Sequence, residues 1–445
     1  MARKHIYDKD LGYTLLKCVW TDWNTKSSYR KYEVRGHENI PTDGAVILCG
    51  NHCNTLMDAL VVLCSDKNPK VFGARADIFR KPLIAKIMYF LRILPMVRQR
   101  DGLRNVLQNN DTQKIIVDTL ESGTMFCLFP EGSHRTMHSL QRLGKGALRI
   151  ALAANDKFGS TKPVYLVPVG IEYGDYFRYH STSLVNIGKP INVTEYLKHG
   201  CFENDAQAID SLRTQLTESL SKLITYIPDN EQYEGKWTLV KMLSLYKSKR
   251  GYGDRFTKLY DCMQNNRKSA AEIETALESA PEQMSEILER AEKFNITRKK
   301  AGISIYSFRK MNPKMNASGK LLAALAGLPY FIYSAVTTLP MWALAFKIRS
   351  GVKDKAFGNT VSFGVKLSLG MIMLLTYTIL AFCLAPWWLA LILMMLYMPA
   401  YSYFHDYIES CRRWISDIRL FRNKGLYKEY ENIVKDFLHI SKMEK

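Results

Sequence analysis

The chain of 445 residues carries a formal net charge of +20, and 47% of its residues are hydrophobic. The length predicts two or three structural units rather than one core, and the basic excess indicates anionic partners: phosphorylated small molecules, acidic lipid surfaces or nucleic acid. Nine scattered cysteines, an odd number without a Cys-x-x-Cys pair, argue against a disulfide framework or a zinc site and favour a reducing compartment.

The first predicted element is an amphipathic helix within residues 1–31. From Leu11 to Trp23 the apolar residues recur at helical spacing along one face. Two interpretations of this face stay open, since it would either pack on its own domain or lie in a lipid interface. The N-terminus has no apolar signal-peptide core, so we expect the domain that follows on the cytoplasmic side of a membrane.

Residues 32–230 alternate short apolar runs with helical patterns, which indicates an α/β domain. The apolar runs are continuous rather than alternating, as expected of strands in a sheet that is covered on both faces. In such sheets ligands bind at the carboxyl ends of the strands. The predicted strands are Ala45–Cys49, Val71–Ala74, Met125–Phe129, Val164–Val169 and Leu184–Ile187.

Two changes of composition follow this domain. Residues 231–310 are charged and helix-favouring without a strand-like run, and we predict a small helical module there. Residues 311–405 contain two long uncharged blocks and are predicted to hold membrane segments. The block 367–404, about 38 residues at about 1.5 Å each, is long enough for two crossings of a hydrocarbon core roughly 30 Å thick. Its midpoint, Ala385-Pro386-Trp387-Trp388, predicts a turn between hairpin helices 367–385 and 387–404.

The other uncharged block, residues 321–346, contains Gly327, Pro329 and Pro340 and has basic residues on both flanks. Because positive residues favour the cytoplasmic side, a re-entrant pair of half-helices satisfies both flanks better than a single span, and both alternatives stay open. The tail, residues 406–445, is also basic and is predicted to be helical. This agrees with a hairpin that returns to the cytoplasmic side.

His52 and Asp58 are the first candidate catalytic residues, because they follow the apolar run that ends at Gly50. An imidazole and a carboxylate at the end of a buried strand can act as a general base and its orienting partner toward a hydroxyl group. Alone, the pair is weak evidence, since this combination is common in chains of this length.

Two further blocks supply groups that bind anions. Arg98 ends an apolar run; it is either a solvated loop residue or, through its guanidinium fork, a phosphate ligand. The predicted strand that ends at Phe129 is followed by Pro-Glu-Gly-Ser-His-Arg. In this turn Gly132 permits close backbone approach, and Ser133 and Arg135 supply donors for an anionic oxygen.

The blocks occur in a fixed order: Asn-His with a following Asp58, an arginine after an apolar run, Phe-Pro-Glu-Gly with a later Lys145-Gly146, and a strand with an internal Pro168. This order resembles the glycerophospholipid acyltransferase family, and residues 32–41 and 186–191 are similar to that family's flanking segments. The resemblance covers residues 32–230. It implies a membrane-bound O-acyltransferase of phospholipid biosynthesis, with a mixed sheet covered by helices.

Two features depart from the family's common pattern. Five residues separate His52 from Asp58 where four are usual, which on an ideal helix turns Asp58 about 240° from His52 instead of about 140°. The histidine is therefore expected in the turn before the helix, where one extra residue can be absorbed. Ser133-His134-Arg135 replaces the usual Thr-Arg-Ser. Both departures, together with residues 353–357, resemble the subgroup that acylates glycerol 3-phosphate or dihydroxyacetone phosphate.

The resemblance also implies a role for each candidate residue. His52 would remove the proton of the acceptor hydroxyl, and Asp58 would orient its ring. The acyl group would come from acyl-CoA or acyl-carrier protein as a co-substrate, with membrane lipids as further partners and no metal or other cofactor. The groups that would hold the acceptor phosphate are Arg98, Glu131, Gly132, Ser133 and Arg135.

Three other functions stay open. The nearest is the same chemistry on lysophosphatidic acid, the 1-acylglycerol 3-phosphate. A non-catalytic, lipid-binding membrane protein is a second alternative, which the intact candidate residues disfavour. Nucleic-acid binding would account for the basic charge, but the chain lacks an aromatic-studded recognition motif or a basic helix, and we predict no nucleic-acid partner.

Overall fold

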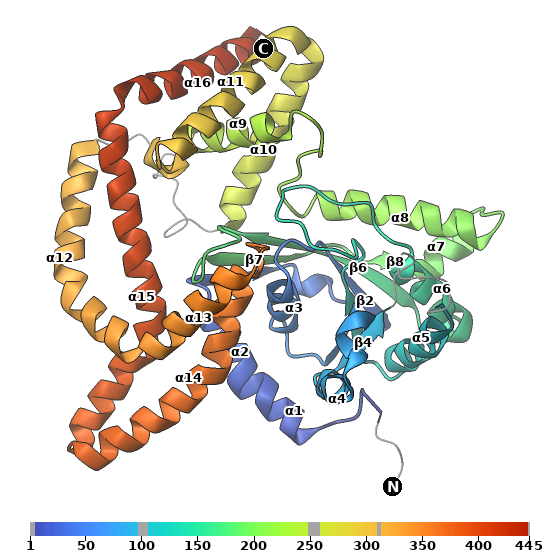
Figure 1. Ribbon diagram of the computed structural model, residues 1–445. Helices are drawn as coiled ribbons and strands as arrows, with labels where there is room; N and C mark the ends of the chain where they lie inside the picture. Colours follow the sequence, from blue (N-terminus) through green and yellow to red (C-terminus); the bar gives the residue numbers. More distant parts are fainter. Residues whose placement is uncertain (1–4, 97–105, 248–258, 309–312, 444–445) are drawn as a thin grey trace. The chain divides into compact units, whose positions relative to one another are not determined.

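The computed structural model describes residues 5–96, 106–247, 259–308 and 313–443 (Figure 1). The chain divides into two compact units. Unit 1 comprises Met1–Lys26, Lys31–Tyr176 and Ser183–Ile224, and unit 2 comprises Ser27–Arg30, Phe177–Thr182 and Thr225–Lys445. Unit 1 therefore contains His52, Asp58 and the turn at residues 131–135.

Unit 1 is built on a sheet with eight strands in the described residues. They are β1 Lys31–Arg35, β2 Ala45–Gly50, β3 Lys70–Arg75, β4 Ile93–Met96, β5 Met125–Leu128, β6 Val164–Tyr173, β7 Thr182–Ile187 and β8 Ile191–Asn192. The order is β1-β7-β6-β2-β5-β3-β4, and β8 pairs with β6. β2 is parallel to β5 and β6, and β3 is parallel to β4 and β5. β6 is antiparallel to β7 and β8, so the sheet is mixed but mostly parallel.

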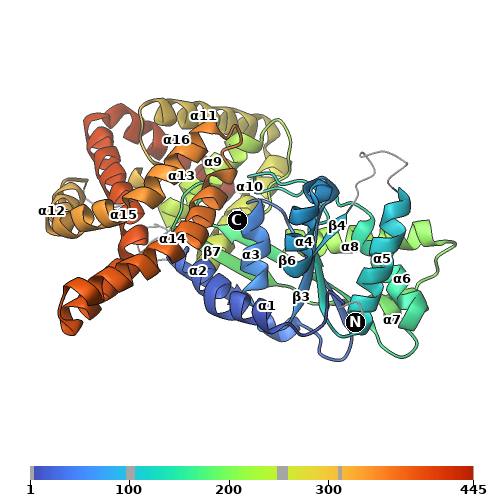
Figure 2. The same ribbon diagram turned by 60° about the horizontal axis from the view of Figure 1, so that its bottom comes forward.

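Helices cover both faces of this sheet. They are α3 Leu56–Leu63, α4 Pro82–Phe90, α5 Val106–Glu121, α6 Gly146–Phe158, α7 Val193–His199 and α8 Asp205–Ser221. Figures 1 and 2 show α5, α6 and α8 on one side of the sheet and α3 on the other. A hydrophobic core joins Ile116, Leu148 and Leu216 of the first group to Ile47 and Phe126 of the sheet. Cover on both faces explains why every residue of β2 is buried.

The predicted α/β fold, a mixed sheet covered by helices and followed by a helical C-terminal region, is confirmed. The five predicted strands are present, but β6 continues four residues past Val169. It does so alongside β7, where Ile171 pairs with Val185 and Tyr173 with Ser183. This extension carries Tyr173 past the end of β2. Tyr173 therefore lies at the end of the sheet where the turns that follow β2 and β5 begin.

The N-terminal helix consists of α1 Leu11–Leu15, a π-helical segment Leu16–Thr21 and α2 Asp22–Ser27. The ring of Tyr13, which is buried, contacts that of Phe90 in α4 edge to face, with 6.4 Å between the centroids. The predicted apolar face is only partly covered: Leu11, Leu15 and Val19 are 76%, 54% and 64% exposed, whereas Leu16 and Trp20 are half-buried. Both interpretations of this face stay open.

Unit 2 is dominated by helices: α9 Tyr233–Lys247, α10 Leu259–Ser279, α11 Pro281–Lys300, α12 Pro313–Thr337, α13 Leu339–Gly351, α14 Phe357–Leu384, α15 Trp387–Arg422 and α16 Lys424–Met443. The C-terminal α16 packs on the helices of the 231–310 segment. Tyr430 Oη donates a hydrogen bond to Met242 O (3.1 Å), and Arg290 forms an ion pair with Asp436 (2.7 Å). The basic tail is thus part of a helical cluster.

Three of the described helices are long and apolar enough to cross a membrane: Ser318–Thr337, Phe357–Leu384 and Trp387–Arg422. In each of the first two helices, only 6% of the most apolar stretch is buried. Long helices that leave apolar side chains uncovered are typical of membrane-associated proteins.

The uncharged blocks fold as helices that are interrupted near Pro340 and Pro386 and continue through Pro329 and Pro399. α14 and α15 are joined at residues 385 and 386, the predicted hairpin turn, and α15 then continues without a break to Arg422. The block 321–346 is divided between α12 and α13, which meet at Thr338. Tyr403 and Tyr407 of α15 donate hydrogen bonds to carbonyl oxygens of α12, at 3.1 and 2.9 Å. The path of this block through a membrane stays a prediction.

Candidate active site

His52 lies in the turn between β2 and α3, and Asp58 lies in the first turn of α3. Within this turn Thr55 has a φ of 48°, in a region that β-branched side chains rarely adopt. Thr55 is one of the five residues between the histidine and the aspartate. Across this turn His52 Nδ1 lies 2.8 Å from Asp58 Oδ2.

Asp58 is completely buried, and hydrogen-bond donors surround its carboxylate. Oδ2 accepts hydrogen bonds from His52 Nδ1 (2.8 Å), Cys53 N (2.8 Å) and Asn54 N (2.7 Å). Oδ1 accepts one from Tyr173 Oη (2.8 Å) and a weaker one from the Cys53 thiol (3.7 Å). Such charge-assisted bonds offset the cost of burying the charge. Because an ionised carboxylate only accepts, we assign the proton of the neutral imidazole to Nδ1 and the basic lone pair to Nε2.

The turn after β5 holds His52 from the opposite side. Glu131 Oε1 accepts a hydrogen bond from His52 N (2.9 Å), and its Oε2 accepts one from Gln141 N (3.0 Å). Arg135 N donates to His52 O (3.0 Å). The ring of Phe129 stacks on the His52 ring with 4.6 Å between the centroids. Both backbone groups and one ring face of His52 are thereby fixed.

The remaining predicted residues of this turn stabilise its conformation. Gly132 has a φ of 69°, which favours glycine. Ser133 Oγ donates a hydrogen bond to Gln141 Oε1 (3.1 Å), and Gln141 Nε2 donates to Ser133 O (2.7 Å). His134 approaches the ring of His52 edge-on, with centroids 5.7 Å apart. Arg98 lies outside the described residues.

Burial changes the ionisation of two groups beside the pair. Loss of solvent raises the pKa of the Glu131 carboxyl, and the amides of His52 and Gln141 oppose this shift in part. Burial also raises the pKa of the Cys53 thiol well above its ordinary value, and the Asp58 carboxylate adds to that shift. Cys53 is therefore a neutral thiol near neutral pH, which does not suit a nucleophile.

Three side chains that hold the site were given no role from the sequence: those of Asn51, which belongs to the Asn-His block, and of Gln141 and Tyr173. The Asn51 amide mimics a strand residue, because its Oδ1 accepts from Ile171 N (2.6 Å) and its Nδ2 donates to Ile171 O (3.1 Å). The β-favouring residues Ile171 and Tyr173 were a signal that the strand continues past Val169. The bond between Gln141 and Glu131 has no counterpart in a sequence pattern.

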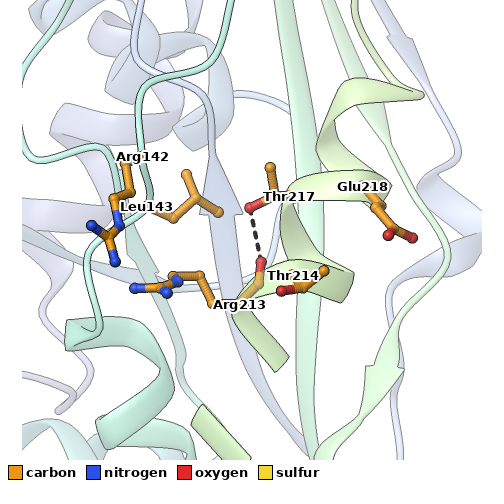
Figure 3. A pocket seen from close by; sticks show the side chains of 6 residues that line it. All are labelled: Arg142, Leu143, Arg213, Thr214, Thr217 and Glu218. Carbon is orange, nitrogen blue, oxygen red and sulfur yellow. Dashed lines mark hydrogen bonds between the residues drawn. The ribbon is translucent and has the colours of Figure 1, made fainter. Parts of the chain in front are cut away.

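One pocket of unit 1, with a volume of about 230 Å³, lies between the loop before α6 and helix α8 (Figure 3). Its lining residues are Arg142, Leu143, Arg213, Thr214, Thr217 and Glu218. His52 and Asp58 are not among them, so the candidate catalytic pair lies outside this pocket. In the described parts of the chain, no group of three or more His, Cys, Asp or Glu side chains is placed to hold a metal ion.

Comparison with known proteins shows what the segment that carries this site is similar to. Residues 31–172 match the model of the acyltransferase family. The matched segment contains the His52–Asp58 pair and the turn at 131–135, and it runs to within one residue of Tyr173. The resemblance seen in the sequence agrees with this match over residues 31–172.

Two similar proteins are both named as acyltransferases of a 1-acylglycerol phosphate. A 1-acyl-sn-glycerol-3-phosphate acyltransferase from Borreliella burgdorferi is 25% identical over 122 residues, which is 27% of this chain and 46% of that protein. The match therefore spans less than half the length of this relative. The crystal structure of the 1-acyl-sn-glycerophosphate (LPA) acyltransferase PlsC from Thermotoga maritima has a TM-score of 0.33 and 18% sequence identity, over 45% of this chain and 76% of that chain.

Proposed function

We propose that the chain is a membrane-bound O-acyltransferase, which moves a fatty acyl group from a thioester to a hydroxyl group of a glycerol phosphate acceptor. The observation that carries this proposal is the 2.8 Å hydrogen bond between His52 Nδ1 and Asp58 Oδ2, in a segment that matches the acyltransferase family. This bond makes Nε2 the basic nitrogen. The pair lies at the carboxyl end of β2, where parallel sheets bind their ligands.

In the proposed reaction His52 Nε2 takes the proton of the acceptor hydroxyl while the hydroxyl oxygen attacks the thioester carbonyl. Asp58 keeps the proton on Nδ1 and stabilises the imidazolium that forms. The tetrahedral intermediate then collapses, the C–S bond breaks, and the imidazolium proton goes to the thiolate. Because an ordinary thiol has a pKa of about 8.5, the thiolate leaves without a dedicated strong acid. Glu131 serves the reaction by holding His52 through its backbone amide.

The acceptor phosphate needs cationic and hydrogen-bonding groups near His52. The amide of Arg135 donates a hydrogen bond to His52 O. The side chain of Arg135 therefore starts from backbone that lies beside His52. We propose Arg135, Ser133 and Arg98 as phosphate ligands, with Gly132 allowing close approach. The carboxylate of Glu131 would repel a phosphate and already accepts two amide hydrogen bonds, so we assign it a positioning role.

Glycerol 3-phosphate, or dihydroxyacetone phosphate, is the acceptor that we propose. The five residues between His52 and Asp58 and the sequence Ser133-His134-Arg135 support it, by resemblance to the subgroup that uses these acceptors. Lysophosphatidic acid is the second candidate, supported by the names of the two relatives. The donor would be acyl-CoA or acyl-carrier protein.

We further propose that residues 32–230 form the catalytic domain on the cytoplasmic face, with residues 311–405 as its membrane anchor and residues 231–310 and 406–445 on the same side. The open face of the N-terminal helix supports contact with lipid. Leu83 and Phe90 of the neighbouring α4 are also exposed, at 68% and 44%. Two adjoining helices with uncovered apolar side chains would place the site at a lipid interface, where the acyl chain and the product belong.

A panel of acceptors and donors tests this function. The full chain, reconstituted in lipid, receives each thioester with glycerol 3-phosphate, dihydroxyacetone phosphate or lysophosphatidic acid, and released thiol and acylated product are measured. We expect turnover to fall about a thousand-fold in His52→Ala and to persist in His199→Ala, which removes an exposed histidine of α7. Undiminished turnover in His52→Ala rejects the assigned base. A preference for lysophosphatidic acid selects the second acceptor, and no transfer with any pair rejects the function.

A further inference from the structure

Tyr173 contacts the candidate base pair from a distant part of the chain. It is the last residue of β6 and is only 3% exposed. Its hydroxyl donates a hydrogen bond to Asp58 Oδ1 at 2.8 Å, although 115 positions separate the two residues. The register with β7 opposite Ser183, and the two bonds between Asn51 and the Ile171 backbone, fix this end of the strand beside the His52 turn.

The two oxygens of Asp58 have different environments. Oδ2 faces His52 Nδ1 and the amides of Cys53 and Asn54, which belong to the same turn as the base. Oδ1 faces Tyr173 and the Cys53 thiol, and a thiol at 3.7 Å is a weak donor. The carboxylate can rotate about the Cβ–Cγ bond of Asp58. On the Oδ1 side, the phenol of Tyr173 is the group that chiefly opposes this rotation.

We propose that Tyr173 is a positioning residue of the transfer reaction: its hydroxyl holds the Asp58 carboxylate in the plane that orients the His52 ring, and it draws negative charge toward Oδ1. This inference rests on the proposed function and adds a residue to that site. Tyr173 does not touch the reacting atoms, since it acts through Asp58. Its hydroxyl proton stays on the phenol throughout the reaction.

Two consequences follow for a variant without the hydroxyl. The carboxylate has more rotational freedom, so the ring of His52 spends less time in the productive orientation. The carboxylate also presents more negative charge to Oδ2, which favours the imidazolium over the neutral ring. The neutral, basic form of His52 is then reached only at higher pH. A merely structural tyrosine would change stability without moving this pH dependence.

The test compares Tyr173→Phe with a matched control, Tyr165→Phe. Tyr165 lies on the same strand, and its hydroxyl also donates to an aspartate, Asp43, at 3.3 Å, but this bond is at the other end of β6. For Tyr173→Phe we expect kcat/KM to fall about five- to thirty-fold with little change in the acceptor KM. The acidic limb of the pH profile should move about half a pH unit upward. Tyr165→Phe should change neither.

A second readout does not need turnover. Diethyl pyrocarbonate modifies neutral imidazole, so peptide mass spectrometry of His52 across a pH series gives the midpoint at which its ring becomes reactive. We expect the same upward shift in Tyr173→Phe. Fluorotyrosine at position 173, a stronger donor of the same shape, should shift the midpoint downward, and it replaces the phenylalanine variant if that variant fails to fold.

Equal midpoints in wild type and in the folded Tyr173 variants overturn the positioning role, and so does an equal shift in Tyr165→Phe. Loss of stability with an unmoved midpoint also overturns it. Absence of thiol release from the wild-type protein rejects the proposed function instead, and the His52 labelling midpoints distinguish that failure from a failure of the contact between Tyr173 and the His52–Asp58 pair.

Discussion

Replacement of Asp58 by asparagine removes one negative charge and keeps the shape of the side chain. In the structure Oδ2 faces three donors, and Oδ1 faces the hydroxyl of Tyr173. The asparagine oxygen can occupy the Oδ2 position, where the amides of Cys53 and Asn54 still find an acceptor. Its amide group then faces the oxygen of Tyr173, which can accept. We therefore expect Asp58→Asn to fold and to lose rate.

The loss of rate follows from one bond. A hydrogen bond to a charged group contributes about 1.5–3 kcal/mol, and we use the upper end because the imidazolium and the carboxylate are both charged when the hydroxyl proton has moved. A loss of about 3 kcal/mol corresponds to a fall of about 150-fold in kcat/KM. Asp58→Ala is different, because it leaves two buried amides and one buried hydroxyl without this acceptor. At about 1–3 kcal/mol each, that cost approaches the whole stability of a domain, about 5–15 kcal/mol.

Thiol release measures the rate of each variant, and thermal unfolding measures its stability. The matched control is Asp66→Asn, because Asp66 is also buried but forms its ion pair with Lys70, at 2.7 Å. This control should lower the melting temperature and leave the rate per folded molecule nearly unchanged. In a His52→Ala background, Asp58→Asn should lower the remaining rate little further, since the aspartate acts through the histidine.

Two results would refute this reasoning. Wild-type activity in folded Asp58→Asn would show that the aspartate does not orient the base. A further loss of about 150-fold in the His52→Ala background would show that Asp58 acts independently of His52.

Three further predictions concern the surroundings of the pair. In lipid vesicles, brominated acyl chains should quench a fluorophore on the exposed Cys18 of the N-terminal helix and not one on the exposed Cys201; equal quenching would contradict the lipid contact. Burial raises the pKa of Cys49 and Cys64 to about 12, so both thiols stay protonated at pH 8. In the detergent-solubilised native protein, iodoacetamide should therefore label them about a thousand-fold more slowly than Cys201. Peptide mapping measures these rates, and comparable labelling would disprove the burial. Glu131→Gln places an amide against a backbone donor of His52 or Gln141 and should lower kcat/KM about tenfold with a stable fold; an effect on the acceptor KM alone would assign Glu131 to substrate binding.

The residues that were predictable from the sequence are those whose contacts are local or follow a strand. His52 and Asp58 lie within one turn, so the end of β2 and the start of α3 were enough to bring them together. The 131–135 turn follows a buried strand, and parallel strands release their turns at one edge of the sheet. The order of these blocks along the chain then pointed to the resemblance with the acyltransferase family, although no single block did.

The contacts that escaped prediction depend on register. Tyr173 reaches Asp58 because β6 extends beyond β2 and pairs with β7, whereas the predicted strand ended at Val169. Pro168 is tolerated because its carbonyl still accepts a hydrogen bond from Gly188 N (2.9 Å) although it has no amide hydrogen of its own. Helical periodicity predicted the apolar face of the N-terminal helix, but it does not decide which residues of that face are covered by packing.

The extra residue between His52 and Asp58 has a structural explanation that joins spacing to chemistry. The Asp58 carboxylate accepts hydrogen bonds from the amides of Cys53 and Asn54, so it closes the turn that carries the base as well as orienting it. Thr55 pays for this closure with an unfavourable backbone conformation, a strain of roughly 1–3 kcal/mol. Three charge-assisted bonds to one buried oxygen, at about 1.5–3 kcal/mol each, are enough to offset it. The imidazole therefore stays beside the carboxylate across a loop of five residues, because the aspartate that orients the ring in the proposed reaction also accepts hydrogen bonds from two amides of the loop.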